Sequence, residues 1–168
     1  RGKGFALLAG FAAALELPEI ACVAVVDADG QHDPAELPRL YAVYQEQQAD
    51  LVIGSRTFAQ ENVPLRSRIG NLFTISLTSA LLGVRISDTQ SGYRLHSRRF
   101  AESIIQTIPG GRYETEMEIL AKAVREGYAI ASVPIRTIYE AGNPTSHFHR
   151  MRDSWRILSS LARAARRK

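Results

Sequence analysis

Several features that would assign this sequence to a special class are absent or scarce. The 168 residues include one cysteine, so no disulfide can form within the chain and a disulfide scaffold is excluded. No run of about 18 apolar residues is present, so we expect no transmembrane helix, and we see no signal peptide. Hydrophobic residues make up 45% and charged residues 23%, which excludes a disordered or collagen-like chain. The composition predicts one globular domain in a reducing, cytoplasmic setting, with Cys22 as a small buried hydrophobic residue.

The positive charge is concentrated at the C-terminal end. Seven of the 21 basic residues and one of the 17 acidic residues lie in 149–168, so the net charge of +4 belongs to this tail and the rest is slightly acidic. At helical spacing, Met151, Trp155 and Leu158 share one stripe and arginines lie beside it. This pattern is typical of an interfacial helix on an anionic membrane surface. A helix that packs its stripe on the sheet is the alternative. We therefore divide the chain into a body, 1–148, and a basic amphipathic helix, 149–168.

Apolar segments of strand length alternate with helical patterns, which predicts an α/β fold. The run 20–26 is continuously apolar, as in a strand that is covered on both faces of a mostly parallel sheet, and we interpret 49–54 (ADLVIG) as a second buried strand. Pro134 predicts an edge strand or a bulge. We expect further extended segments at 93–95 and 129–139, and helices at 5–17, 33–48, 66–82, 98–107 and 114–126.

Two carboxylates and an amide follow the first predicted strand. Asp27, Asp29 and Gln31 keep the two-residue alternation of that strand, so in extended backbone their side chains point the same way. Oxygen ligands grouped in this way suit Mg²⁺ or Mn²⁺. Ligands of open α/β sheets bind beyond the carboxyl ends of the strands, which is where these residues lie. The pattern therefore predicts a divalent metal site.

Other interpretations of this loop remain open. An EF-hand is excluded, because His32 and Pro38 occupy the positions that require glycine and glutamate. The two aspartates would otherwise only shape a turn. We interpret Asp33, which precedes Pro34, as a helix N-cap, and His32 as a loop residue rather than a metal ligand.

An ordered set of segments resembles a known family. RGKGFALLAGF, VVDADGQHDP, GSR, DTQSGYR and VPIRTIYE, followed by SHFHRMRDSWRI, are similar to family 2 glycosyltransferases of the dolichol-phosphate or polyprenol-phosphate mannosyltransferase type. The resemblance covers essentially the whole chain. It implies a GT-A fold with a Rossmann-like, mostly parallel sheet flanked by helices. It also implies inverting transfer from a nucleotide-sugar, and a metal held by Asp27, Asp29 and Gln31.

The same resemblance suggests that the chain is N-terminally truncated. Family members begin with a strand that carries a P-x-x-N-E-like segment and with further elements that bind the nucleotide base, and this chain starts after them. We expect a fragment that lacks its first strand or strands and most of the base-binding subsite.

Three arginines are candidates for phosphate contacts. Loss of a diphosphate leaving group builds negative charge, which a metal and nearby cations stabilise. Arg56, which ends the second predicted strand in the GSR segment, is the strongest candidate. Arg66 and Arg68 open the helix predicted next, where they would either bind donor or acceptor phosphate or form a solvated helix face.

The nature of the acceptor decides whether a general base is needed. A polyprenyl monophosphate is mostly dianionic at neutral pH, since its second pKa is near 6 by analogy with phosphorylated side chains, and needs no base. A sugar hydroxyl in cell-envelope polysaccharide synthesis would need one. Asp88 is the leading candidate, and Glu114 and Glu116 follow. The alternative for Asp88 is a turn residue paired with Arg94.

Further residues are assigned to the acceptor side and to a loop. Gln90 and Ser91 precede Gly92, which would let the backbone approach a ligand closely. For Glu114 and Glu116, the alternative is that they complement the dipole of a helix as first-turn acids. Residues 146–148 (Ser146, His147 and Phe148) resemble the family's mobile loop over the donor.

Together these features predict a metal-dependent inverting glycosyltransferase that acts at the inner face of the membrane. Its expected partners are a nucleotide-sugar donor, a lipid-phosphate acceptor and an anionic membrane surface. A non-catalytic membrane- or nucleic-acid-binding module is the alternative from another class. Nucleic acid is not expected, because the body is slightly acidic and carries no RNA-binding signature.

Overall fold

The computed structural model describes residues 2–56, 88–89, 91–112, 114–136 and 138. The elements in chain order are α1 (Lys3–Leu15), β1 (Cys22–Val25), the 3₁₀ turn η1 (Pro34–Glu36), α2 (Leu37–Gln47), β2 (Leu51–Arg56), β3 (Arg94–Ser97), α4 (Arg98–Thr107), α5 (Glu114–Arg125) and β4 (Ile130–Ile135). The helix predicted at 66–82, the loop at 146–148 and the basic helix at 149–168 lie outside the described residues. None of the helices described is long and apolar enough to span a membrane.

The four described strands form one mixed sheet in the order β1-β3-β2-β4. Strand β3 is antiparallel to both β1 and β2, and β2 is parallel to β4. Three strands therefore run in one direction, and β3 is inserted against it. The expected α/β sheet flanked by helices is confirmed, and β4, which contains Pro134, lies at one end of this sheet as expected for an edge strand.

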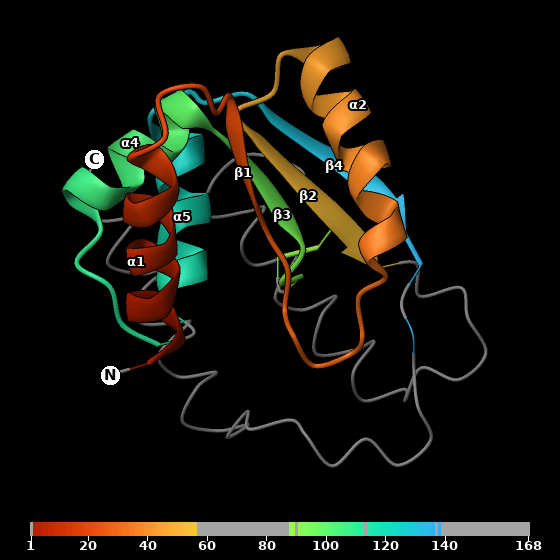
Figure 1. The fold of residues 1–168 in the computed structure, drawn as a ribbon, viewed down its shortest axis with the longest axis horizontal. Helices are drawn as coiled ribbons and strands as arrows, with labels where there is room; N and C mark the ends of the chain where they lie inside the picture. The colour runs from red at the N-terminus through yellow and green to blue at the C-terminus, as the bar shows by residue number, and fades with distance from the viewer. Residues whose placement is uncertain (1, 57–87, 90, 113, 137, 139–168) are drawn as a thin grey trace.

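Helices cover both faces of the sheet. Figure 1 shows α1, α4 and α5 on one side and α2 on the other. Successive side chains of β2 point to opposite faces of the sheet and so enter both cores. Leu51 and Ile53 pack with Phe11 and Phe100 on the first side. Val52 packs on the side of α2. Each such fully buried side chain contributes about 1.5–3 kcal/mol to folding. This packing holds the ends of β1 and β2 in place at the same edge of the sheet.

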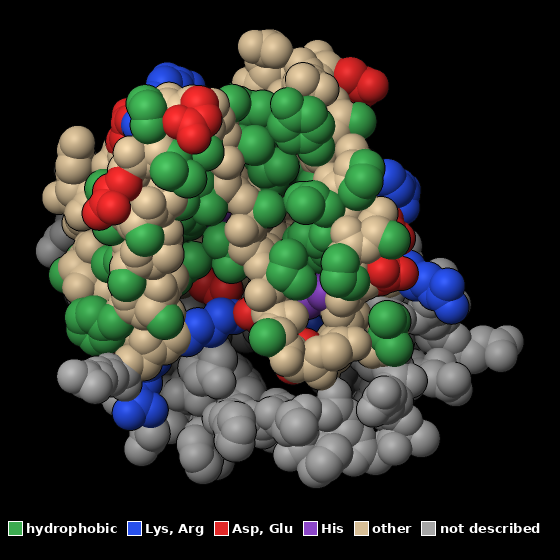
Figure 2. Space-filling model, in the orientation of Figure 1, with side chains coloured by type: hydrophobic (Ala, Val, Ile, Leu, Met, Phe, Trp, Pro, Cys, Tyr) green, Lys and Arg blue, Asp and Glu red, His purple; other side chains and the backbone are tan. Residues whose placement is uncertain are grey.

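Strand β1 departs from the expectation of burial on both faces. Val23 and Val25 pack against the α1 and α4 side, but Ala24 is exposed and Val26 is 40% exposed. Cys22 is free and only half-buried. The reason is that β1 lies at one end of the described sheet and pairs there with β3. Figure 2 shows hydrophobic side chains gathered on the surface between α1 and α2.

Candidate functional site

The loop after β1 bends instead of continuing the strand. The strand ends at Val25 and the backbone bends at residues 28–30, so the expected extended alternation of Asp27, Asp29 and Gln31 is wrong. Asp29 is exposed, and its Oδ1 accepts a hydrogen bond from the Gln31 backbone N–H at 3.1 Å. This local bond competes with extended backbone, which is a common effect of aspartate in turns. The bend leaves Asp27 next to the sheet and places Asp29 in solvent.

Asp33 caps a helix, as predicted. Its Oδ1 accepts a hydrogen bond from the Ala35 backbone N–H at 2.9 Å, and Pro34 follows it at the first position of η1.

A lysine links Asp27 to the start of α5. Lys3 Nζ lies 2.6 Å from Asp27 Oδ1 and 3.0 Å from Glu116 Oε1. The side chains of Lys3, Asp27 and Glu116 are 30%, 27% and 13% exposed. Burial lowers the pKa of Lys3, but the charges of Glu116 and Asp27 outweigh this effect and raise the pKa above its ordinary value. The lysine is therefore a cation at neutral pH.

Two glycines allow this cluster to form. A Cβ on Gly4 would lie 2.0 Å from Thr115 Oγ1, and the Gly4 N–H donates to the Gly111 carbonyl at 3.1 Å. The start of α1 therefore packs directly on the start of α5 and places Lys3 between the two carboxylates. A Cβ on Gly92 would lie 2.0 Å from Asp27 Oδ2, so Asp27 rests against the backbone at Gly92.

Lys3 was not among the predicted site residues. The signal that would have found it is the RGKG segment, whose glycines flank the lysine at the start of a helix.

Arg56 and Asp88 form a bidentate ion pair beside this cluster. Arg56 Nε donates to Asp88 Oδ2 at 2.7 Å, and Arg56 Nη2 donates to Asp88 Oδ1 at 3.1 Å. The Arg56 backbone N–H also donates to Oδ2, at 3.3 Å, and Asp88 is fully buried. Charge-assisted pairs of this shape fix the orientation of both groups. Both Asp88 oxygens accept from Arg56, so the carboxylate fixes the orientation of the guanidinium.

The alternative pairing of Asp88 with Arg94 is wrong. Buried Arg94 instead donates to three backbone carbonyls, those of Thr89, Ser91 and Glu116, at 2.9, 2.9 and 3.0 Å. These carbonyls satisfy the guanidinium, so it needs no carboxylate. Arg94 thus ties the segment that contains Asp88 to the first turn of α5. Ser91 is buried, and its Oγ accepts from the Tyr93 backbone N–H at 3.3 Å.

His32 is buried near this edge, and Glu114 is half-buried. The His32 ring meets the Tyr93 ring edge-on with centroids 5.5 Å apart, and burial lowers the pKa of His32 despite the opposing charges of Asp27 and Asp29. His32 is therefore neutral at pH 7. Glu114 Oε2 is buried without a hydrogen-bond partner among the described residues.

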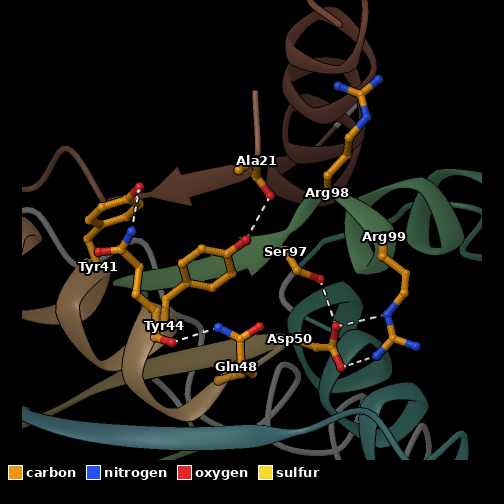
Figure 3. Close-up of a pocket in the computed structure, with 10 residues that line it drawn as sticks. Ala21, Tyr41, Tyr44, Gln48, Asp50, Ser97, Arg98 and Arg99 are labelled. Atoms are coloured by element: carbon orange, nitrogen blue, oxygen red, sulfur yellow. Dashed lines mark hydrogen bonds and ion pairs between the residues drawn. The ribbon is translucent and has the colours of Figure 1, made fainter. Parts of the chain in front are cut away.

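A cavity of about 610 Å³ lies at the opposite end of the sheet (Figure 3). It adjoins Ala21 and Asp50, which precede β1 and β2, and Ser97, which ends β3. Its polar groups bind one another: Ser97 Oγ donates to Asp50 Oδ1 at 2.9 Å, and the Tyr44 hydroxyl donates to the Ala21 carbonyl at 3.1 Å. Arg99 also pairs with Asp50. These internal bonds make the cavity wall a structural junction between strand ends.

The remaining predicted residues are Arg66, Arg68, Gln90 and 146–148, which lie outside the described residues. Among the residues that are described, no three His, Cys, Asp or Glu side chains gather as a metal site. The predicted metal set contains two carboxylates and one amide, all oxygen donors, which suits a hard divalent cation. Gly92 leaves room for the Asp27 carboxylate. The oxygen ligands therefore fit such an ion. In this structure the ammonium group of Lys3 pairs with one of the Asp27 oxygens.

Comparison with known proteins identifies the family. The profile of Glycosyl transferase family 2 matches residues 1–105, which is more than half of the chain. The chain belongs to glycosyltransferase family 2.

Several relatives with assigned activities are similar to this family 2 chain. A UDP-N-acetylglucosamine–dolichyl-phosphate N-acetylglucosaminyltransferase of Methanococcus voltae is 35% identical, over 83% of this chain and 56% of that protein. A polyprenol monophosphomannose synthase of Mycolicibacterium smegmatis is 34% identical, over 80% of this chain and 51% of that protein. The chain thus spans about half the length of these relatives.

A solved structure shows the same fold. Glucosyl-3-phosphoglycerate synthase from Mycobacterium tuberculosis, in complex with Mn²⁺ and uridine-diphosphate-glucose, superposes with a TM-score of 0.70. It is 22% identical, and the match covers 98% of this chain and 54% of that one. The expected GT-A fold is confirmed.

Proposed function

We propose that the protein is an inverting glycosyltransferase that moves a sugar from a nucleotide-sugar to a polyprenyl phosphate. The observation that carries the proposal is the gathering of Asp27, Glu116 and the Arg56–Asp88 pair around the ends of β1 and β2. Ligands of α/β sheets bind beyond strand ends of this kind. The names of the relatives from Methanococcus voltae and Mycolicibacterium smegmatis support a lipid-phosphate acceptor.

The donor side of the proposed site would hold a divalent metal. Asp27, Asp29 and Gln31 would supply its oxygen ligands, and the complex of the mycobacterial neighbour with Mn²⁺ supports such an ion, Mg²⁺ or Mn²⁺. When bound, the ion stabilises the negative charge that develops on the leaving diphosphate. The guanidinium of Arg56, oriented by Asp88, would contact the same phosphates. Arg66 and Arg68 would add further phosphate contacts.

The hydrogen bonds that Asp88 accepts from Arg56 favour a phosphate acceptor over a sugar hydroxyl. A hydroxyl acceptor needs a base with a free oxygen within hydrogen-bond reach, whereas both Asp88 oxygens accept from Arg56. A phosphate dianion is itself the nucleophile. The residues assigned to the acceptor side, Gln90, Ser91, Glu114 and Glu116, would then position the acceptor without accepting its proton.

The proposal also includes binding of the protein to a membrane. The tail 149–168, with seven basic residues, would bind the anionic inner face of the membrane and bring the catalytic body, 1–148, to its lipid substrate. The loop 146–148 would close over the donor. No nucleic-acid partner is proposed.

The test is sugar transfer by the full-length protein, assayed with nucleotide-sugars and polyprenyl phosphate in the presence of Mg²⁺ or Mn²⁺. Asp29→Ala removes a proposed metal ligand that is exposed and makes only a local turn contact, so we expect loss of transfer with little loss of stability. Asp33→Ala in the same loop removes a helix cap and is the matched control. It should cost about 1 kcal/mol of stability and retain transfer. Undiminished transfer by Asp29→Ala would refute the metal role.

A further inference from the structure

We propose that Lys3 is a place-holding cation that competes with the divalent metal for Asp27. The inference rests on the proposed function, because it assumes that Asp27 is a metal ligand. It assigns to the RGKG segment a role in setting the metal affinity of the site.

The first support is the geometry of the ammonium group. Lys3 Nζ is within hydrogen-bond distance of one oxygen of Asp27 and one of Glu116, at 2.6 and 3.0 Å. The other Asp27 oxygen faces the backbone at Gly92, where a Cβ would lie 2.0 Å away. A metal that binds Asp27 must therefore either displace the ammonium from Oδ1 or share the carboxylate with it.

The second support is charge. Asp27 and Glu116 are two carboxylates that share one nitrogen partner and are only 27% and 13% exposed. Without a cation between them, two like charges at this separation repel. Lys3 supplies that cation, and a divalent ion would supply it equally well on the Asp27 side. The two cations are thus alternatives for the same carboxylate.

The third support is the way in which the lysine is held. The close contact of Gly4 with Thr115 and the bond from its N–H to Gly111 fix the first turn of α1 on the start of α5. Glu116 lies in that same turn of α5. When a metal takes Asp27, Lys3 keeps Glu116 as a partner and does not need to leave the site. The exchange therefore requires only a side-chain movement.

The experiment measures Mn²⁺ binding to the full-length protein by electron paramagnetic resonance of the free ion, with no donor or acceptor present. If Lys3 competes for Asp27, Lys3→Met should bind Mn²⁺ about threefold to tenfold more tightly, the scale set by a partly exposed ion pair. Lys3→Arg keeps the charge and should stay close to the wild type. Lys3→Gln is a second neutral variant, to be used if the methionine variant does not fold.

Lys122→Met is the matched control for net charge. Lys122 also makes an ion pair, with Glu126 at 2.7 Å, near the C-terminal end of α5. The affinity of the Lys122→Met variant for Mn²⁺ should equal that of the wild type.

The outcomes separate the two proposals. Weaker or unchanged Mn²⁺ binding by the neutral Lys3 variants, in a wild type that binds the ion, overturns the place-holder role and leaves the metal site standing. A wild type that binds no Mn²⁺ overturns the metal site of the proposed function and the place-holder role with it.

Discussion

The folded protein should lose stability in mild acid because of one buried histidine. His96 lies in β3 between Phe11 and Phe100, with ring centroids 4.9 and 6.0 Å away, and it is almost fully buried. Burial first, and the neighbouring charge of Arg94 second, lower the pKa of His96 to about 3. An unfolded chain restores the ordinary value of about 6.5.

The sign and size of the effect follow from proton binding. Between pH 6.5 and pH 3 the unfolded state binds a proton at His96 that the folded state does not, so stability falls as the pH falls. One proton corresponds to about 1.4 kcal/mol for each pH unit below 6.5, which gives about 2 kcal/mol between pH 7 and pH 5. His32, whose pKa is also lowered by burial, adds to the loss in the same direction.

The assay is urea unfolding followed by circular dichroism at pH 7 and pH 5, where ordinary carboxylates, with pKa values of about 4, titrate little. His96→Leu replaces the imidazole with an apolar side chain of similar size in an apolar site. Its loss of stability from pH 7 to pH 5 should be about 2 kcal/mol smaller than that of the wild type. An equal loss in both proteins would refute the assignment of this acid sensitivity to His96. The internal control is the stability of the wild type at pH 7 and at pH 8.5. His96 should contribute no difference there, because it is largely deprotonated in both the folded and the unfolded chain.

Two further predictions concern the site. Gly92→Ala places a Cβ 2.0 Å from Asp27 Oδ2, so the Asp27 carboxylate must move. We therefore expect the affinity for Mn²⁺, measured by calorimetric titration, to fall at least tenfold. Unchanged Mn²⁺ binding would contradict the close contact between Gly92 and Asp27. Asp88→Asn keeps the shape of the side chain but removes the charge that pairs with Arg56 inside the protein. The free energy of unfolding, measured by urea titration, should fall by about 3–5 kcal/mol, which is the typical cost of breaking a buried ion pair. A loss below about 1 kcal/mol would show that the Asp88 carboxylate is not the main partner of Arg56.

Much of the framework follows from local sequence. Apolar periodicity placed α1, α2, α4 and α5 close to where they lie, and the Asp33–Pro34 pair marked the start of η1. Helix faces and caps depend on residues three or four positions apart, so a single sequence carries them. The ordered segments likewise indicated family 2 and the GT-A fold, both confirmed.

The sheet arrangement depended on tertiary packing. Strand β3 is short and wholly buried, and its antiparallel insertion between β1 and β2 cannot be read from its own residues. The exposure of β1 has the same origin, since an apolar run shows that a strand forms but does not show which neighbours cover it.

The sequence by itself determined which residue types are available at the candidate site: the acidic loop after β1, Arg56, Asp88 and the acids at the start of α5. The tertiary structure alone decided how they pair. In the folded chain Asp88 pairs with Arg56, 32 positions away, and not with Arg94. Folding also brings together Lys3 of α1, Asp27 of the loop after β1 and Glu116 of α5. Local patterns fix helices and turns, whereas ion pairs between distant segments depend on which backbones pack closely enough to meet, as Gly4 and Gly92 allow here.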